Sequence, residues 1–178
     1  MTINVAINGF GRIGRNVFRA NYESGNNSEI NIVAINDLGD TEINAHLLKY
    51  DTAHGPFGKS VQIKNNKIII DDKDEVLVLS ERDPSKLPWK ELNIDVVMEC
   101  TGFFASKEKS MSHIDAGAKK VLISAPASNV DATIVYGVNH EILNDSHKIV
   151  SNASCTTNCL APLIKNIHAE LTVESGIM

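Results

Sequence analysis

The chain has 178 residues, with 17 Lys and Arg against 22 Asp and Glu, for a formal net charge of −5. This length predicts one domain, or one domain and a fragment of another, and a composition of 43% hydrophobic and 22% charged residues excludes a disordered chain. The acidic balance argues against a nucleic-acid or anionic-membrane binder. Neither a membrane-length apolar run nor a signal-peptide pattern is present in the sequence. We therefore expect a cytoplasmic protein whose partners are small molecules or proteins.

The first 37 residues predict a β-α-β unit. A β-branched strand at 3–8 runs into the glycine-rich sequence GFGRIG at 9–14, and a helical pattern follows until the Gly-Asn-Asn cluster at 25–27. A second apolar strand is expected at 30–35. A parallel strand pair with a crossover helix has this order and length.

Further elements alternate along the rest of the chain. We expect a short helix at 43–50, a hairpin of 60–64 and 67–71, and strands at 76–79, 94–99, 120–124, 133–136 and 148–151. Strands that alternate with helical or loop stretches predict an α/β fold of the Rossmann type, a doubly wound, mostly parallel sheet with helices on both faces.

The last predicted element is a helix that begins at Cys155. Its apolar positions fall on one face of a 3.6-residue period, at Leu160, Leu163, Ile164, Ile167 and Leu171. Pro162 lies inside this pattern, so we expect it to kink the helix or to delay its start.

The glycine turn and the acidic residue after it predict a dinucleotide site. Gly9 permits a tight turn, Gly11 lets the backbone approach a pyrophosphate, and Gly14 lets the helix pack against the sheet. Asp37 ends the second strand, where a carboxylate accepts hydrogen bonds from ribose hydroxyls and repels a 2′-phosphate. Together with Leu38, it favours NAD over NADP.

The three cysteines lack the paired spacing of a zinc site and are odd in number, so we expect neither a metal nor a disulfide framework. Cys155 follows a strand at the start of the last helix, where free N–H groups and the helix dipole favour a nucleophilic thiolate and can receive an oxyanion. Cys159 is expected to lie deeper as a packed apolar group, and Cys100 to be structural.

Several longer motifs point to one family. They are INGFGRIGR at 7–15, the aspartate of IND at Asp37, ERDP at 81–84, PWKEL at 88–92, ECTG at 99–102, GAKKVLISAP at 117–126, YGVNHE at 136–141 and SNASCTTNCLAP at 151–162. This set resembles phosphorylating glyceraldehyde-3-phosphate dehydrogenase, in order and over the whole chain.

The resemblance implies NAD as the cofactor and Cys155 as the nucleophile, with Ser154 and Thr156 at a phosphate-substrate site. The implied reaction is attack of Cys155 on a phosphorylated aldehyde, hydride transfer to NAD and release of an acyl phosphate by inorganic phosphate. The implied cofactor residues are Gly9, Phe10, Gly11, Arg12, Ile13, Gly14, Asn36, Asp37, Arg82, Thr101, Gly102 and Ser124.

One part of the family pattern does not fall within these residues. The family's general-base histidine would follow shortly after Met178, as would further residues for the substrate phosphates. None of the histidines present matches it, and each is expected to be a surface or structural residue: His46, His54, His113, His140, His147 and His168.

We therefore interpret 1–151 as an NAD-binding domain and 152–178 as the start of a truncated catalytic domain. We expect a chain limited to these residues to bind NAD weakly and not to turn over, and the full-length protein to be a homotetramer.

Two alternatives remain open from the sequence. Erythrose-4-phosphate dehydrogenase shares the fold, the glycine turn and the cysteine motif. A non-catalytic dinucleotide-binding module would share the turn alone. Nucleic-acid binding through the dinucleotide site is disfavoured by the acidic charge and the lack of a basic aromatic face.

Overall fold

A computed structural model describes residues 2–25 and 28–178. Its strands are β1 (Ile3–Asn8), β2 (Ile30–Asn36), β3 (Tyr50–Asp51), β4 (Gly55–Pro56), β5 (Val61–Lys64), β6 (Lys67–Ile70), β7 (Asp74–Leu79), β8 (Val96–Glu99), β9 (Lys120–Ile123), β10 (Ala132–Thr133) and β11 (Ile149–Ser151). Its helices are α1 (Arg12–Glu23), α2 (Thr41–Lys49), α3 (Lys107–Asp115) and α4 (Cys155–Leu171), with 3₁₀ turns η2 (Pro84–Lys86) and η3 (His140–Ile142).

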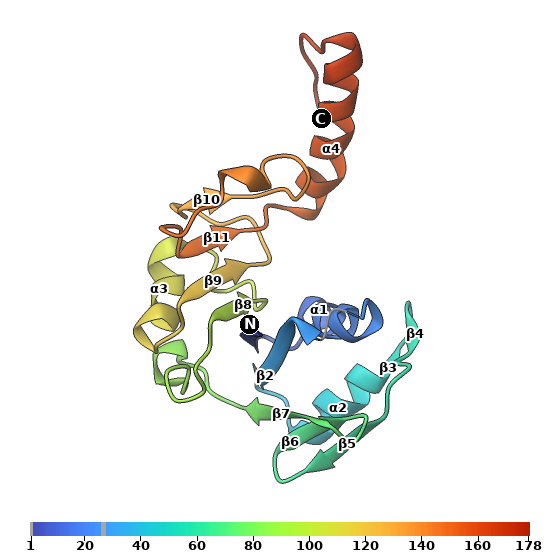
Figure 1. Cartoon of the computed structure of the whole chain (residues 1–178), viewed down its shortest axis with the longest axis vertical. Coiled ribbons are helices and arrows are strands. Elements are labelled where there is room, and N and C mark those ends of the chain that lie inside the picture. The colour runs from blue at the N-terminus through green and yellow to red at the C-terminus, as the bar shows by residue number, and fades with distance from the viewer. Residues whose placement is uncertain (1, 26–27) are drawn as a thin grey trace.

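Nine strands form one sheet in the order β10-β11-β9-β8-β1-β2-β7-β6-β5 (Figure 1). Every neighbouring pair from β10 to β7 is parallel, whereas β6 runs antiparallel to β5 and β7. Strands β3 and β4 make a small separate ladder. The carboxyl ends of the parallel strands therefore share one edge of the sheet.

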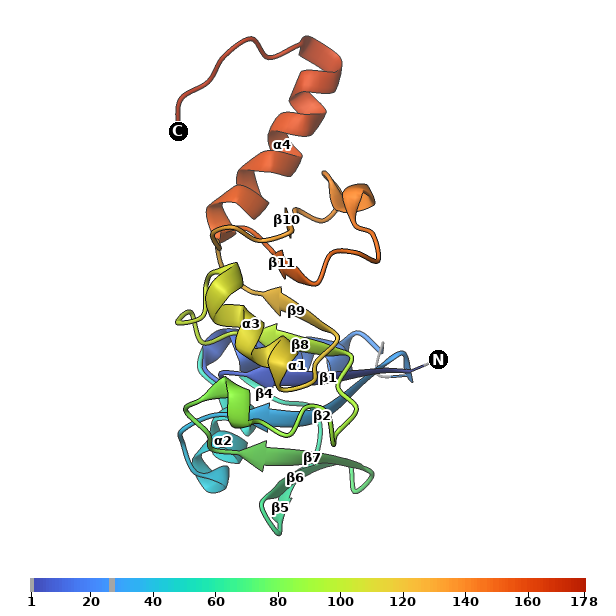
Figure 2. The same ribbon diagram turned by 90° about the vertical axis from the view of Figure 1, so that its left-hand side faces the viewer.

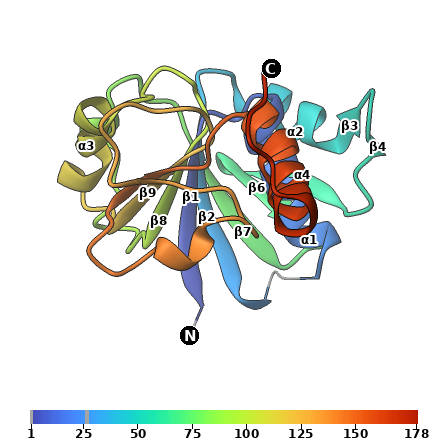
Figure 3. The ribbon, with the colours of Figure 1, turned by 90° about the horizontal axis from the view of Figure 1, so that it is seen from above.

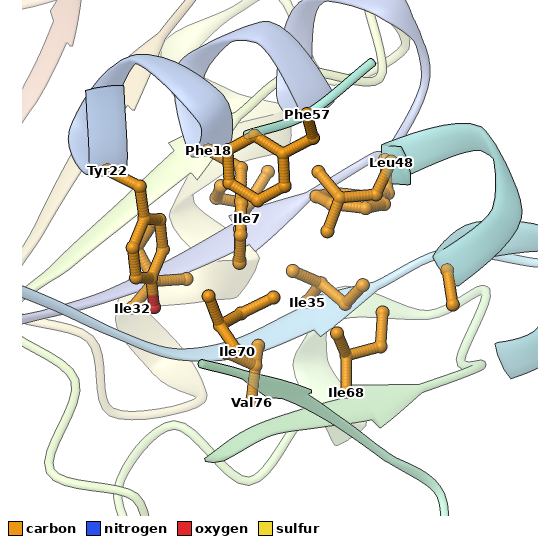
Figure 4. Packing of buried hydrophobic residues seen from close by; sticks show 12 residues of the cluster. Ile7, Phe18, Tyr22, Ile32, Ile35, Leu48, Phe57, Ile68, Ile70 and Val76 are labelled. Carbon is orange, nitrogen blue, oxygen red and sulfur yellow. The ribbon is translucent and has the colours of Figure 1, made fainter. Parts of the chain in front are cut away.

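Two hydrophobic cores form on opposite faces of the sheet, because successive strand residues point to opposite sides. Ile7 and Ile35 face the α1 and α2 side, where Phe18 and Tyr22 of α1 pack on them (Figure 4). Ala6 and Ala34 belong to the other core, with Trp89 and Ile123.

The helices accordingly cover both faces, with α3 on one side and α1 and α2 on the other (Figure 3). The predicted Rossmann-type α/β fold is confirmed.

Two predicted helix boundaries differ slightly from the structure. Helix α1 ends at Glu23 with Ser24 as its cap, just before the cluster at 25–27 that was expected to end it, of which residues 26 and 27 lie outside the described residues. Helix α2 begins two residues earlier than expected, because the Asp40 carboxylate accepts the Ile43 N–H at 2.7 Å and caps the helix.

The strand predicted at 133–136 is wrong in extent, since β10 covers only Ala132–Thr133. The side chain of Asn139 takes the place of a strand partner there. It accepts the Val135 N–H at 2.7 Å and donates to the Thr133 carbonyl at 3.0 Å, which turns the chain out of the sheet.

Helix α4 begins at Cys155, as the sequence predicts, because the Ser154 hydroxyl accepts the Thr157 N–H and fixes its start. Pro162 lies inside the helix and does not delay its start. Cys159 is exposed instead of packed, since α4 leads away from the sheet (Figures 1 and 2). None of the residues of α4, all of which the structure describes, is buried.

Candidate dinucleotide pocket and cysteine turn

A pocket of about 490 Å³ opens at the carboxyl ends of β1, β2 and β8, where the strand order changes direction. Ligands of open α/β sheets bind at this switch point. Its lining comes from the ends of these strands and the segments that follow them: Asn8, Gly9, Gly11, Asn36, Asp37, Leu38, Glu81, Arg82, Cys100, Thr101, Phe103 and Phe104.

The glycine turn is built as the sequence predicts. Gly9 has a φ of +90°, and a Cβ there would lie 2.7 Å from the Thr101 nitrogen. A Cβ on Gly14 would lie 2.1 Å from the Gly9 carbonyl oxygen, so α1 packs against the turn only with glycine at this position. A Cβ on Gly11 would meet nothing within 4 Å, which leaves the backbone accessible at the start of α1.

The N-terminus of α1 is open to an anion. Within the described chain no side chain caps it, and its first turn carries no acidic residue. The unpaired N–H groups and the positive end of the helix dipole therefore face the space in front of Gly11.

Asp37 holds the turn from the end of β2. Its carboxylate accepts the Phe10 N–H at 2.8 Å and the Gly39 N–H at 2.9 Å. The side chain also lines the pocket, beside Leu38, which is 55% exposed. The sequence predicts the ligand-facing role of Asp37, whereas its second role as an anchor of the glycine turn is visible only in the structure.

The floor of the pocket is a row of buried amides. Asn36 donates to the Asn8 side-chain oxygen at 2.7 Å and to the Glu81 carbonyl at 2.9 Å, and it accepts the Glu81 N–H at 2.8 Å. These bonds occupy the Asn36 side chain, which is 5% exposed. Asn36 thus joins the floor to the segment that carries Arg82.

The wall after β8 carries Cys100, Thr101, Phe103 and Phe104. Burial raises the pKa of the Cys100 thiol to about 11, and the nearby Glu99 carboxylate adds to this shift. Cys100 is therefore a protonated thiol at neutral pH and a lining group of the pocket.

All twelve predicted cofactor residues lie in the described part of the chain, and six of them line the pocket while the other six do not. The first group is Gly9, Gly11, Asn36, Asp37, Arg82 and Thr101; the second is Phe10, Arg12, Ile13, Gly14, Gly102 and Ser124. The side chain of Phe10 lies in the core, and that of Arg12 pairs with Asp51 at 3.2 Å. The Phe10 N–H is also occupied, by Asp37, so of these two residues the backbone N–H of Arg12 remains for a ligand at the turn.

Several lining residues are absent from the sequence prediction, namely Asn8, Glu81, Cys100, Phe103 and Phe104. Leu38, which the sequence pairs with Asp37 in the preference for NAD, lines the pocket as well. Asn8 and Cys100 lie where β1 and β8 end. Their position at the end of adjacent parallel strands is a signal that could have found them.

The cysteine turn lies on the same edge of the sheet, after β11. The Asn152 N–H donates to the Ile123 carbonyl at 2.9 Å, and the Ser151 hydroxyl donates to the Ala125 carbonyl at 2.7 Å, so the turn is attached to the end of β9. Ala153 is held at a φ of 58°, a region that costs a non-glycine residue about 1 kcal/mol or more.

The turn presents its polar groups at the start of α4. The Ser154 oxygen lies 2.9 Å from the Thr156 hydroxyl and accepts the Thr157 N–H at 2.9 Å. Cys155 is exposed beside them. A thiol in this position has helix N–H groups close by and open access from solvent.

The pocket and the cysteine turn are separate sites along one edge. Strand β11 lies three strands from β1, which is about 14 Å at the usual spacing of parallel strands. An extended ligand that starts at the glycine turn can reach across β8 and β9 toward Cys155.

Two kinds of feature are absent from the described residues, namely a membrane-spanning helix and a metal site. The described helices include none that is long and apolar enough to cross a membrane. The same part of the chain holds no group of three or more His, Cys, Asp or Glu side chains suited to a metal ion.

Comparison with known proteins decides the family. The family model described as "Glyceraldehyde 3-phosphate dehydrogenase, NAD binding domain" matches residues 3–107. The chain belongs to the glyceraldehyde 3-phosphate dehydrogenase family.

Relatives in this family match the whole chain. Two proteins of Cupriavidus necator, "Glyceraldehyde-3-phosphate dehydrogenase, plasmid" and "Glyceraldehyde-3-phosphate dehydrogenase, chromosomal", are each 58% identical over 179 residues, which cover 100% of this chain and 53% of the relative. The glyceraldehyde-3-phosphate dehydrogenase of Pseudomonas aeruginosa is 55% identical over 178 residues, with the same coverage of 100% and 53%. The chain spans about half the length of the curated relatives it matches.

As a member of the glyceraldehyde 3-phosphate dehydrogenase family, the chain has NAD as its cofactor. The pocket fits this ligand. The open backbone at Gly11 and the uncapped start of α1 suit a diphosphate, the Asp37 carboxylate suits hydroxyl groups, and Leu38 and Phe103 offer apolar surface to a flat base.

Proposed function

We propose that the intact protein is a phosphorylating glyceraldehyde-3-phosphate dehydrogenase, which oxidises glyceraldehyde 3-phosphate to 1,3-bisphosphoglycerate in glycolysis. One observation carries the proposal: a dinucleotide pocket and an exposed cysteine at a helix N-terminus lie along the same edge of one sheet. NAD, when bound, supplies the hydride acceptor for the oxidation.

Cys155 is the proposed nucleophile. Its thiolate adds to the aldehyde carbon to form a thiohemiacetal, and the N–H groups of the first turn of α4 stabilise the oxygen that gains charge. Oxidation leaves a thioester on the sulfur. Inorganic phosphate then attacks the thioester carbon, which breaks the carbon–sulfur bond and returns the Cys155 thiolate. A thioester retains enough of the free energy of oxidation to form an acyl phosphate.

Ser154 and Thr156 are the proposed residues for a phosphate group at this turn. Their hydroxyls lie at the N-terminus of α4, where unpaired N–H groups and the helix dipole favour an anion. Each can rotate from its present hydrogen bond to donate to a phosphate oxygen.

The proposed cofactor residues combine the turn, the floor and the wall of the pocket. Arg12 and Ile13 donate backbone N–H groups to the diphosphate, Asp37 accepts from the adenosine ribose, and Arg82 lies beside the adenine. The remaining contacts are assigned to Gly9, Phe10, Gly11, Gly14, Asn36, Thr101, Gly102 and Ser124. A carboxylate at Asp37 disfavours the 2′-phosphate of NADP.

The proposal includes a division of the 178 residues into two domains. We assign 1–151 to the NAD-binding domain and 152–178 to the start of the catalytic domain. A polypeptide limited to these residues would bind NAD weakly and would not turn over, since none of its six histidines matches the family's general base. For the intact protein we propose a homotetramer and a cytoplasmic location. The free thiols at Cys100, Cys155 and Cys159 agree with the proposed location, because the cytoplasm keeps thiols reduced.

The test begins with the mass of the purified intact protein, followed by NAD reduction with glyceraldehyde 3-phosphate and inorganic phosphate. We expect turnover that Cys155→Ser abolishes and that the matched control Cys159→Ser leaves largely intact. Faster turnover of erythrose 4-phosphate would assign the protein to that dehydrogenase instead. NAD binding without turnover of either aldehyde by the intact protein would indicate a non-catalytic module.

A further inference from the structure

A row of buried polar side chains lies directly beneath the pocket. Asn8, Asn36 and Glu99 end the adjacent strands β1, β2 and β8, and Asn8 is in register with both of the others. They are 2%, 5% and 1% exposed, respectively. Polar groups this deeply buried are costly unless all of their hydrogen bonds are made.

Glu99 is the centre of this row, and both of its carboxylate oxygens are occupied. One oxygen accepts the Asn8 amide at 2.6 Å and faces the His113 Nε2 at 3.0 Å. The other accepts the Thr101 N–H at 2.7 Å and also the Thr101 hydroxyl. Four donors therefore compensate a carboxylate that has no contact with solvent.

The orientation of His113 is fixed by the buried side chain of Trp89. The Trp89 indole N–H, which can only donate, lies 3.0 Å from the His113 Nδ1. Nδ1 is therefore an acceptor, so Nε2 carries the proton and donates to Glu99. Both rings are 0% exposed, which makes this a rigid support under Glu99.

The bonds from Glu99 continue into the wall of the pocket. The Thr101 hydroxyl that donates to Glu99 also accepts the Phe103 N–H at 3.0 Å. Helix α3 holds the same wall from outside, because the Ser110 hydroxyl donates to the Phe104 carbonyl at 2.7 Å. The positions of Thr101, Phe103 and Phe104, all of which line the pocket, thus depend on groups below it.

We infer that Glu99 is a positioning residue of the dinucleotide site, which sets the affinity for NAD by fixing Thr101 and the wall at 101–104 from beneath the pocket. This inference rests on the proposal that the pocket is the NAD site. Glu99 is not one of the described residues that line the pocket, so its effect on NAD passes through Thr101.

The chemistry requires a carboxylate at this position. Each carboxylate oxygen faces two donors, and one donor on each side cannot become an acceptor. The Thr101 backbone N–H can only donate, and the His113 Nε2 must keep its proton as long as Nδ1 accepts from Trp89. The amide of Glu99→Gln has one NH₂ group, which would face a donor in either orientation. The substitution keeps the shape of the side chain and removes at least one hydrogen bond.

The experiment is a double-mutant cycle on the intact protein, with the dissociation constant for NAD as the measured quantity. We expect Glu99→Gln to weaken NAD binding about tenfold and Thr101→Val, which is matched in shape, by several fold. Because both variants break the same link, the double variant should bind about as well as Glu99→Gln alone. Thr101→Ser keeps the hydroxyl and should restore binding to near the wild-type value.

Ile68→Val is the control for a variant that loses stability while Thr101 and the wall at 101–104 keep their positions. Ile68 is 0% exposed in the core on the α1 and α2 face, remote from Glu99. This variant should unfold at a lower temperature and bind NAD as the wild type does.

The measured NAD affinities either support or overturn the role of Glu99. Wild-type affinity in Glu99→Gln, or effects of Glu99→Gln and Thr101→Val that multiply in the double variant, would overturn the inference. If Glu99→Gln fails to fold, Thr101→Val against Thr101→Ser decides: equal affinities in this pair overturn it, and weaker binding by Thr101→Val alone supports it. A wild-type protein that does not bind NAD would instead contradict the assignment of the pocket.

Discussion

The two sites on the carboxyl edge of the sheet differ in how the chain supports them. The dinucleotide pocket stands on strands that are buried on both faces, with Glu99, Asn8 and Asn36 bonded to one another underneath. The cysteine turn is attached at its base through Ser151 and Asn152, but α4 beyond it has no buried residue in the described chain.

The described residues surround the pocket on more sides than they surround α4. The turn, floor and wall of the pocket are each fixed by groups within the described chain. Helix α4 exposes apolar side chains, including Leu163 at 55% and Leu171 at 77%. The described residues therefore fix the geometry of the pocket more firmly than that of α4.

The first prediction tests this contrast in packing. Ile7→Ala removes a fully buried side chain between β1 and α1 and should lower the free energy of unfolding by about 2–5 kcal/mol. In the 178-residue polypeptide, Leu163→Ala on the exposed face of α4 should change it by less than about 0.5 kcal/mol. Urea unfolding of this polypeptide measures both. An equal loss in the two variants would contradict the difference in packing, because it would mean that Leu163 is buried.

The second prediction concerns the three thiols. Burial raises the pKa of Cys100 from 9.0 to about 11, so its thiolate fraction at neutral pH should be about 100-fold lower than without this shift. Cys155 and Cys159 are both exposed. Iodoacetamide should label these two first, and Cys155 before Cys159 because of its place at the helix N-terminus. Peptide mass spectrometry gives the order, and early labelling of Cys100 would contradict it.

The third prediction separates the protein's own packing from ligand contact in the glycine turn. A Cβ on Gly11 meets no protein atom within 4 Å, so Gly11→Ala should leave stability unchanged and weaken NAD binding about tenfold. Gly58→Ala is the matched control, since Gly58 is equally unobstructed and lies away from the pocket. Calorimetric titration with NAD compares them. Equal affinities in the two variants would show that no ligand approaches Gly11.

The smallest effect is a pH dependence at the support of the cysteine turn. The Lys107 ammonium, assisted by the backbone N–H groups of Ile149 and Lys148, lowers the pKa of Asp131 to about 2. Folding therefore favours the carboxylate, and its contribution is present above the unfolded pKa of about 4 and is lost as the pH falls toward 2.

Asp131→Asn should accordingly cost about 1 kcal/mol of stability at pH 7. The difference from the wild type should shrink as the pH is lowered below about 4. Urea unfolding at a series of pH values follows it, and a difference that stays constant down to pH 3 would show that Asp131 contributes nothing through its charge.

Local sequence patterns predicted the elements whose residues are close in the chain. The turn from Gly9 to Gly14, the acidic end of β2 at Asp37 and the start of α4 at Cys155 were all found, because each depends on neighbours within a few positions. Helix α3 was missed, since its sequence is mostly polar and buries only Ser110 and His113. Its buried face is polar because it meets Glu99 and the Phe104 carbonyl.

Local patterns in the sequence are enough to predict the fold class, the glycine turn and a cysteine at the start of the last helix, because backbone conformation and periodicity depend on neighbouring residues. The groups that surround these features become visible only once the chain is folded. The bond between Asn8 and Glu99 joins residues 91 positions apart, and that between Trp89 and His113 joins residues 24 apart. Nothing in the spacing of these residues specifies that they meet. The pairing of β1 with β8 and the packing of α3 bring them together, and burial then makes each hydrogen bond necessary.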